Sequence, residues 1–184
     1  MIKKYYEINR LDLSNYKFVL LHGNNEGLKN EIISELTLKN SKYKFLKYDE
    51  KEIIENINPL YNNVINGSLF DDGNLIIIHR SSDKLLPIIE QIFDKKLENT
   101  MFLISANILD KKSKLRSFFE KNERSISVAF YPDTNETLTK LAQNFFYNNK
   151  IPMSFENINI IVNKCSGDRG FLKNELEKIA LFSK

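Results

Sequence analysis

The chain contains few of the side chains from which metal sites and catalytic sites are most often built. Its 184 residues include one cysteine, Cys165, two histidines, His22 and His79, and no tryptophan. A single cysteine excludes an intramolecular disulfide and a zinc site made of cysteines, and it fits the reducing environment of the cytoplasm. Two histidines argue against a histidine-based metal site and against a catalytic triad.

Long apolar segments and a strong net charge are also lacking. No apolar run approaches the ~18 residues of a membrane span, and residues 1–12 contain no apolar core of a signal peptide. The 27 Lys and Arg residues nearly balance 24 Asp and Glu residues, so the net charge is only +3. A balance this small does not by itself indicate nucleic-acid binding. The composition, 42% hydrophobic and 28% charged, is that of a globular protein with one α/β domain and a small appendage.

Short apolar runs with the length of β-strands alternate with segments of helical spacing. The runs occupy residues 18–22, 43–48, 75–79, 101–106 and 126–131. Apolar residues recur at helical spacing in the segments 28–36, 53–60, 85–93 and 109–119. Strands that alternate with helices indicate βαβ units, and near-continuous apolar strands are typical of a sheet covered on both faces. The sequence therefore predicts an α/β fold with a five-stranded, mostly parallel sheet and flanking helices.

The pattern changes near residue 133, after which no run has strand character. Residues 134–148, 154–165 and 171–182 have helical spacing, and Asp168 is placed to cap the last of these helices. We therefore expect an α/β domain over residues 1–132 and a small three-helix domain over residues 133–184.

The segment that follows the first predicted strand has the context of a phosphate-binding loop but departs from its consensus. A working loop has the pattern G-x-x-x-x-G-K-[ST] between a strand and a helix. Counted from Gly23, the second glycine position holds Leu28, the lysine position holds Lys29 and the Ser/Thr position holds Asn30. Gly27 lies one residue early. Leu28 has a Cβ where the backbone must approach phosphate, and Asn30 lacks the hydroxyl that would bind magnesium.

A second part of an ATPase site is missing as well. A P-loop ATPase needs an acidic pair at the end of an apolar strand to hold magnesium and activate water. Here the strand Leu75–Ile78 is followed by His79 and Arg80. We therefore expect no ATP hydrolysis, no metal and no cofactor. Lys29 is predicted to be a surface lysine on the first turn of a helix rather than a phosphate ligand.

Two large apolar residues, Leu69 and Phe70, lie between turn-forming residues. Asn66, Gly67 and Ser68 precede them, and two aspartates and a glycine follow. One interpretation is a short helical turn that folds both side chains back onto the sheet. The other is a protruding plug that enters a partner's pocket, since burial of a Leu and a Phe yields roughly 3–6 kcal/mol, the scale of a binding hot spot.

Basic residues cluster at the predicted start of the helix near residue 114. Lys111, Lys112, Lys114 and Arg116 form either a solvated helix face or a contact with another protein subunit or with DNA phosphates. The segment from Gly167 to Gly170 is interpreted as a turn between two helices.

Together these segments resemble the delta subunit of the bacterial DNA polymerase III clamp loader. The matching segments follow the family's order over almost the whole chain: LLHGNNEG, SLFDDGNLIIIHR, MFLISANILDKKSKLRSFFE, the Tyr-Pro after the fifth strand, and GDRGFLKNELEKIALF. The resemblance implies an AAA+-like, clamp-binding domain without ATP over residues 1–132. It also implies a helical lid over residues 133–184. We expect the C-terminal collar domain of the family to be absent from this chain.

The resemblance further implies a role for the apolar pair. In the family, a Leu-Phe pair at the position of Leu69 and Phe70 inserts into a hydrophobic pocket of the ring-shaped beta sliding clamp. The chain would have no catalytic site of its own and would open the ring for loading on primed DNA, within the cytoplasmic DNA polymerase III holoenzyme. Its implied partners are the clamp and the gamma/tau and delta prime subunits, with DNA reached only through the loader and no membrane.

Two other interpretations stay open at this stage. The chain would be an active P-loop NTPase if it bound nucleotide with magnesium-dependent turnover. It would be a nucleic-acid-binding module if it bound DNA without the clamp and lost affinity steeply with salt. The altered loop argues against the first, and the small net charge argues against the second.

Overall fold

The computed structural model describes residues 1–8, 16–65, 73–95 and 99–183. The chain folds into two compact units. The first consists of Met1–Asn24 and Glu31–Phe130, and the second of Asn25–Asn30 and Tyr131–Lys184. The second unit thus includes the turn that follows the first strand of the sequence pattern, and this turn is where the phosphate loop was expected.

A parallel sheet of six strands forms the centre of the first unit. Its strands are β1 (Ile2–Lys3), β2 (Phe18–Gly23), β3 (Lys44–Asp49), β4 (Asn74–Ser81), β5 (Thr100–Ala106) and β6 (Ser125–Phe130). The order across the sheet is β1-β6-β2-β5-β4-β3, and neighbouring strands pair in parallel. All five predicted strands are present. The sixth, β1, pairs with β6 over two residues and is too short to leave an apolar run in the sequence.

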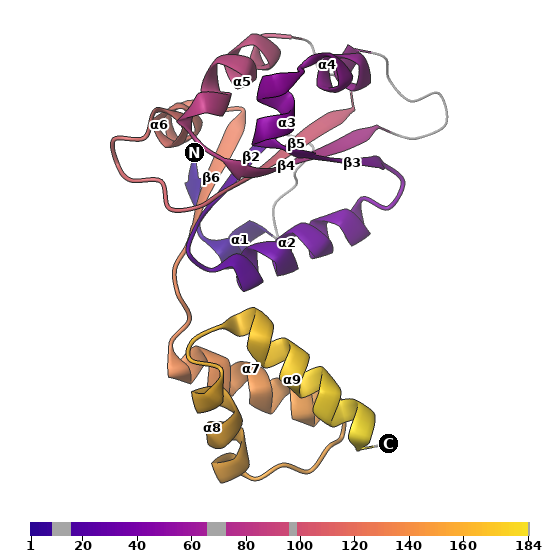
Figure 1. The fold of residues 1–184 in the computed structure, drawn as a ribbon, viewed down its shortest axis with the longest axis vertical. Helices are drawn as coiled ribbons and strands as arrows, with labels where there is room; N and C mark the ends of the chain where they lie inside the picture. Colours follow the sequence, from indigo (N-terminus) through magenta and orange to yellow (C-terminus); the bar gives the residue numbers. More distant parts are fainter. Residues whose placement is uncertain (9–15, 66–72, 96–98, 184) are drawn as a thin grey trace. The chain divides into compact units, whose positions relative to one another are not determined.

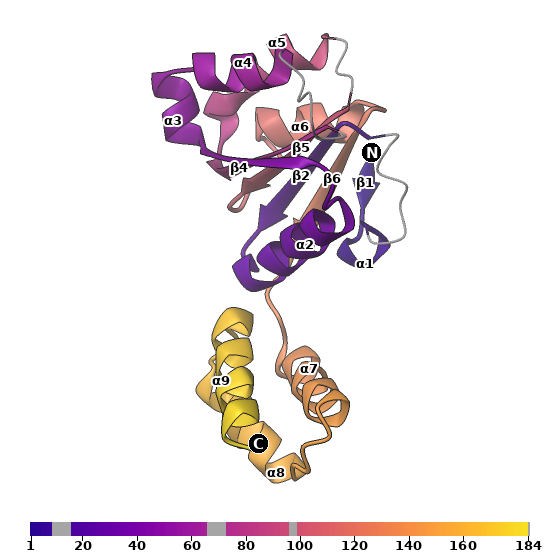
Figure 2. The same cartoon turned by 90° about the vertical axis from the view of Figure 1, so that its right-hand side faces the viewer.

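Helices cover both faces of this sheet. They are α1 (Tyr5–Ile8), α2 (Glu26–Lys39), α3 (Glu50–Glu55), α4 (Asn58–Ile65), α5 (Leu86–Phe93) and α6 (Lys114–Lys121), with a short 3-10 helix, η2 (Asp83–Leu85). Figures 1 and 2 show α3 to α6 on one face and α1 and α2 on the other. The predicted helical segment 53–60 is divided between α3 and α4, because Asn56 is extended and ends α3.

One hydrophobic core of this unit lies between the sheet and the helices α3 to α6. Its centre is aromatic: the rings of Phe18 and Phe102 stack at 4.9 Å, and Phe93 lies 4.8 Å from Phe18. The apolar strands β2, β4 and β5 are buried almost throughout, as expected for central strands of a covered parallel sheet. No helix in the described ranges has the length and apolar character needed to cross a lipid bilayer.

Three helices make up most of the second unit: α7 (Asn135–Asn148), α8 (Phe155–Lys164) and α9 (Arg169–Phe182). Side-chain oxygens cap the start of each helix, and they come from Thr134, Ser154 and Asp168. The predicted cap at Asp168 is therefore confirmed. Cys165 is buried in the core of this unit, and burial raises the pKa of its thiol, so the thiolate is disfavoured.

Candidate functional site: the altered phosphate loop

The candidate site begins at Gly23, the last residue of β2. Its φ of +129° is one that residues with a side chain rarely adopt. A Cβ at this position would lie 2.1 Å from the carbonyl oxygen of Phe130 on the neighbouring strand. The Gly23 amide donates to the carbonyl of Asn107 at 3.1 Å. The glycine is therefore required by the close approach of β6, whether or not an anion binds nearby.

Substitution of Gly23 by Ala is expected to destabilise the protein by about 2 kcal/mol or more, because the new methyl group meets backbone atoms in a conformation that is itself strained. Urea denaturation of the full chain measures the change. Gly167→Ala is the matched control, since Gly167 also has a positive φ, +85°, but a Cβ there meets no atom within 4 Å. An equal loss in both variants would show that φ alone, and not the contact with Phe130, demands the glycine.

The start of α2 is capped by Asn25, which is buried. The Asn25 Oδ1 accepts from the Leu28 amide at 3.0 Å. Its Nδ2 donates to the Tyr131 carbonyl at 3.0 Å and to Asp133 Oδ2 at 2.8 Å. In a working phosphate loop, amides at the helix start point at the phosphate. Here the Leu28 amide is bonded to the chain's own side chain.

Lys29 corrects one of our predictions. It was expected to be a surface lysine, but its side chain is fully buried, and its Nζ lies 2.6 Å from Glu26 Oε1. Glu26 is 56% exposed, so the pair joins a buried ammonium group to a carboxylate at the surface. Because the ammonium group donates to a carboxylate one turn earlier in the same helix, it does not reach out as a phosphate-binding lysine would.

The backbone at the start of α9 packs against the turn. A Cβ on Gly27 would lie 2.9 Å from the Gly170 nitrogen and 3.0 Å from Arg169 Cβ. The Arg169 guanidinium pairs with Asp133 at 3.2 Å, with side-chain exposures of 15% and 7%. Because Asp133 also accepts from Asn25, the turn residues Asn25–Asn30 are bonded within the second unit by side chains of this chain.

Sequence reasoning missed this network. Asn25 was one of several polar residues in a loop, and Asp133 was noted only as the first residue of the helical domain. Arg169 was interpreted as part of a turn between helices, and it is in fact the first residue of α9. Only the Arg169 position gave a signal, since it follows the residue expected to cap that helix. The pairing depends on residues far apart in the sequence, which composition and spacing do not reveal.

The backbone near the end of β4 departs from regular strand geometry. Arg80 adopts a φ of +55° next to an irregularity in the pairing of β4 with β5, and its guanidinium pairs with Asp49 at the end of β3. The neighbouring Glu50 accepts from the Ser82 amide at 2.7 Å and from its hydroxyl. The carboxylates of Asp49 and Glu50 are therefore already paired with groups of this chain. Within the described residues, no three His, Cys, Asp or Glu side chains gather to hold a metal ion.

The predicted basic cluster is divided in the structure. Lys111, Lys112 and Lys114 are exposed before and at the start of α6. Arg116 is engaged within the fold instead, since its Nε donates to Glu120 at 2.7 Å and its Nη1 donates to the Leu109 carbonyl at 3.0 Å. Three of the four cations are thus available to a partner, and Arg116 stabilises α6 and the loop before it.

The carboxylate of Asp83, in η2, caps the start of helix α6. Its carboxylate accepts from the Ser113 hydroxyl at 2.6 Å and from the amides of Lys114 and Leu115 at 3.1 and 3.0 Å. The Ser113 hydroxyl, followed by the amides of Leu115 and Lys114, lowers the pKa of this carboxyl. The charged form is therefore favoured in the folded state, as expected for an anion at a helix start.

Replacing Asp83 by Asn is expected to cost about 1 kcal/mol of stability at neutral pH, the usual value of a capping side chain. A lowered folded pKa means that the carboxylate's contribution is present above its ordinary pKa, about 4, and is lost as the pH falls below that value. The difference between the two proteins should therefore shrink on acidification. Urea denaturation across this pH range measures it, with the exposed Glu90→Gln as control. A difference that persists at low pH would contradict a role for the charge.

The predicted clamp-binding residues Ser68, Leu69 and Phe70 lie outside the described residues. The structure describes the chain on both sides of them. Helix α4 ends at Ile65, and Gly73 precedes β4. A Cβ on Gly73 would lie 2.0 Å from the Asn99 carbonyl oxygen. The role of the Leu-Phe pair stays a prediction of the sequence.

Comparison with protein-family models and with curated protein sequences gives no match. Solved structures are similar. The Bacillus subtilis DNA clamp loader delta protein has a TM-score of 0.63 at 14% identity over 97% of this chain and 57% of its own. Domain III of the Thermotoga maritima replication initiation protein DnaA has a TM-score of 0.51 at 12% identity over 97% and 80%. The Thermotoga maritima RuvB Holliday junction branch migration motor has a TM-score of 0.57 at 13% identity over 88% and 53%.

These likenesses show the fold of the chain. At 12–14% identity they show that the chain shares the fold of these structures, over 97% of its length in two of the three cases. The chain spans little more than half of the delta protein, 57% of its length. All three similar proteins act on DNA or in its replication, according to their names. The architecture of this chain, a parallel α/β sheet with flanking helices, is therefore that of an AAA+-like fold.

Proposed function

We propose that this chain is a non-catalytic delta-type subunit of the DNA polymerase III clamp loader, which binds the beta sliding clamp and opens the ring. The proposal rests on the interactions made by the loop that follows β2. Its lysine is buried against Glu26, and the Leu28 amide donates to the side chain of Asn25, so groups that would bind nucleotide are held by the chain itself. A chain with this fold and no nucleotide chemistry acts by binding. The likeness to a clamp loader delta protein supports this choice of partner.

In the proposed mechanism, the free energy of binding opens the ring, and no covalent step is needed. Leu69 and Phe70 enter an apolar pocket of the clamp, and contacts that are better in the open ring than in the closed ring shift the population toward the open ring. The shift equals the difference in affinity between the two states, so that each tenfold difference is worth about 1.4 kcal/mol. The gamma/tau and delta prime subunits would complete the loader. ATP bound to other loader subunits would control whether this chain reaches the clamp, and DNA would be reached through the loader.

The experiment is a binding titration with the sliding clamp of the same organism in buffer without nucleotide. Fluorophores on the two sides of one clamp interface report whether the ring separates there. We expect saturable binding accompanied by a loss of energy transfer across that interface. Binding without any change across the interface would retain the clamp as partner and contradict ring opening.

The same titration is repeated with a DNA duplex in place of the clamp. Failure of the clamp to bind at about 100 μM, a free energy weaker than roughly −5.5 kcal/mol, would overturn the proposal. Clamp-independent DNA binding that falls steeply with salt would favour a nucleic-acid-binding module instead.

A further inference from the structure

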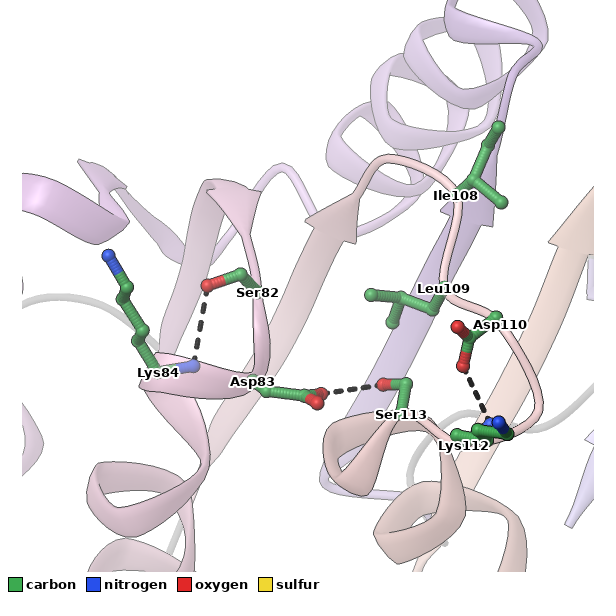
Figure 3. A pocket seen from close by; sticks show the side chains of 8 residues that line it. All are labelled: Ser82, Asp83, Lys84, Ile108, Leu109, Asp110, Lys112 and Ser113. Carbon is green, nitrogen blue, oxygen red and sulfur yellow. Dashed lines mark hydrogen bonds between the residues drawn. The ribbon is translucent and has the colours of Figure 1, made fainter.

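A pocket lies at the carboxyl ends of β4 and β5. Its volume is about 460 Å³, within the range of sites that bind ligands or side chains of a partner. Two segments line it, one after β4 and one between β5 and α6 (Figure 3). The lining residues are Ser82, Asp83, Lys84, Ile108, Leu109, Asp110, Lys112 and Ser113. In open parallel sheets, the carboxyl ends of the strands are where ligands usually bind.

The acidic residues of this pocket are already engaged by hydrogen-bond donors of the chain. Asp83 accepts from the Ser113 hydroxyl and from two amides at the start of α6. Asp110 Oδ1 accepts from the Lys112 amide at 2.6 Å. Each carboxylate thus stabilises a helix start or a turn. A ligand cation would have to compete with these donors, so the carboxylates are poor candidates for a cation site.

The side chains of the basic residues of the pocket, in contrast, are not engaged in this way by the described residues. The side chains of Lys84 and Lys112 are exposed, and the described part of the chain offers neither of them an ion-pair partner. Figure 3 shows them at opposite ends of the lining. The exposed Lys111 extends the positive charge beyond Lys112. The groups left to recognise a ligand are therefore ammonium groups.

Two apolar side chains, Ile108 and Leu109, also line the pocket. Ile108 is 64% exposed, which is high for an isoleucine. Leu109 is half-buried, and Figure 3 shows its side chain directed toward η2. A ligand that covered this surface would gain from burial of both side chains, at roughly 25 cal/mol per Å² of apolar area.

We propose that this pocket binds an acidic peptide segment of a partner protein that has one apolar side chain between its carboxylates. The apolar side chain packs on Ile108 and Leu109, and the flanking carboxylates pair with Lys84 and Lys112. A nucleic-acid backbone fits less well, because it offers no apolar side chain to Ile108. The inference does not depend on clamp binding, whose expected residues lie in another segment.

The test follows the backbone amide signals of the ¹⁵N-labelled full chain during titration with a synthetic peptide. The peptide has a central leucine flanked on each side by aspartate and glutamate. We expect the amides of residues 82–84 and 108–113 to shift and to saturate. Lys84→Glu with Lys112→Glu should weaken binding by about tenfold or more, since two attractive pairs become repulsive. The control, Lys42→Glu with Lys44→Glu, changes the net charge equally at exposed residues near the start of β3 and should leave the affinity within about twofold.

Three results would overturn the inference. The first is the absence of saturable shifts at about 1 mM peptide, or shifts confined to other residues. The second is equal binding of a peptide with serine in place of the leucine, which would show charge attraction without a pocket. The third is a DNA duplex that shifts the same amides at lower concentration than the peptide does. The amide spectra of the variants show directly whether each one is folded.

Discussion

Replacing Leu69 and Phe70 together by Ala is expected to weaken binding to the sliding clamp by at least about 100-fold. Full burial of these two side chains yields roughly 3–6 kcal/mol, and a 100-fold loss corresponds to about 2.7 kcal/mol. Residues that dominate interfaces are large apolar or aromatic anchors in a partner's pocket, as proposed here. Clamp binding of the full chain, measured at equilibrium for both proteins, gives the ratio directly.

The matched control is the variant Leu38→Ala with Phe45→Ala. It removes the same two side-chain types, and both residues are exposed, Leu38 at 76% and Phe45 at 36%. Its affinity should stay within about threefold of the native value, since scattered exposed apolar residues contribute little to a specific interface. Equal weakening in the two variants would mean that general surface hydrophobicity, and not the Leu-Phe pair, attracts the clamp. Unchanged binding of the first variant would place the clamp contact elsewhere.

Arg169→Ala is expected to destabilise the helical unit by about 3 kcal/mol. The guanidinium is 15% exposed and pairs with Asp133, which is 7% exposed, so its removal leaves a buried carboxylate without its main counter-charge. Loss of one partner of a buried pair usually costs about 3–5 kcal/mol, and the remaining donors from Asn25 and Thr137 lower the cost here. Hydrogen exchange of the full chain should show faster exchange of amides in α7, α8 and α9.

A surface ion pair on the same helix provides the control. Lys178 lies 2.6 Å from Glu175 and is 61% exposed, so Lys178→Ala should cost less than about 1 kcal/mol. The double variant Asp133→Ala with Arg169→Ala should be less unstable than the sum of the two single variants, since it leaves no unpaired charge. Additive losses would show that the two residues act independently.

Local sequence signals were sufficient for most of the fold. The apolar runs that predicted strands β2, β4, β5 and β6 are buried almost throughout, because a central strand of a covered sheet has no polar face. The run that predicted β3 forms the edge strand and is mostly exposed or half-buried. Asp168 was identified as a helix cap because capping depends on residues three positions apart. Strand β1 was missed, since two residues leave no periodic signal.

The site was predicted less completely, because its contacts join distant segments. The departures at Leu28 and Asn30 are visible in the sequence. The hydrogen bond between Asn25 and Asp133, which are 108 positions apart, is not visible in the sequence. Lys29 was wrongly assigned to the surface, because a lysine on a first helical turn is usually solvated, and its burial depends on packing that spacing alone does not report.

The central claim is that the chain acts by binding and not through nucleotide, and a titration of the full chain with MgATP tests it most directly. Calorimetry and the thermal unfolding midpoint are followed together, with an active loader ATPase subunit as positive control. A site with a Kd one hundredth of the ATP concentration would stabilise the fold by about 2.7 kcal/mol. We predict no heat of binding and no shift of the midpoint at millimolar MgATP. Saturable binding at micromolar concentration with magnesium-dependent release of phosphate would contradict the account.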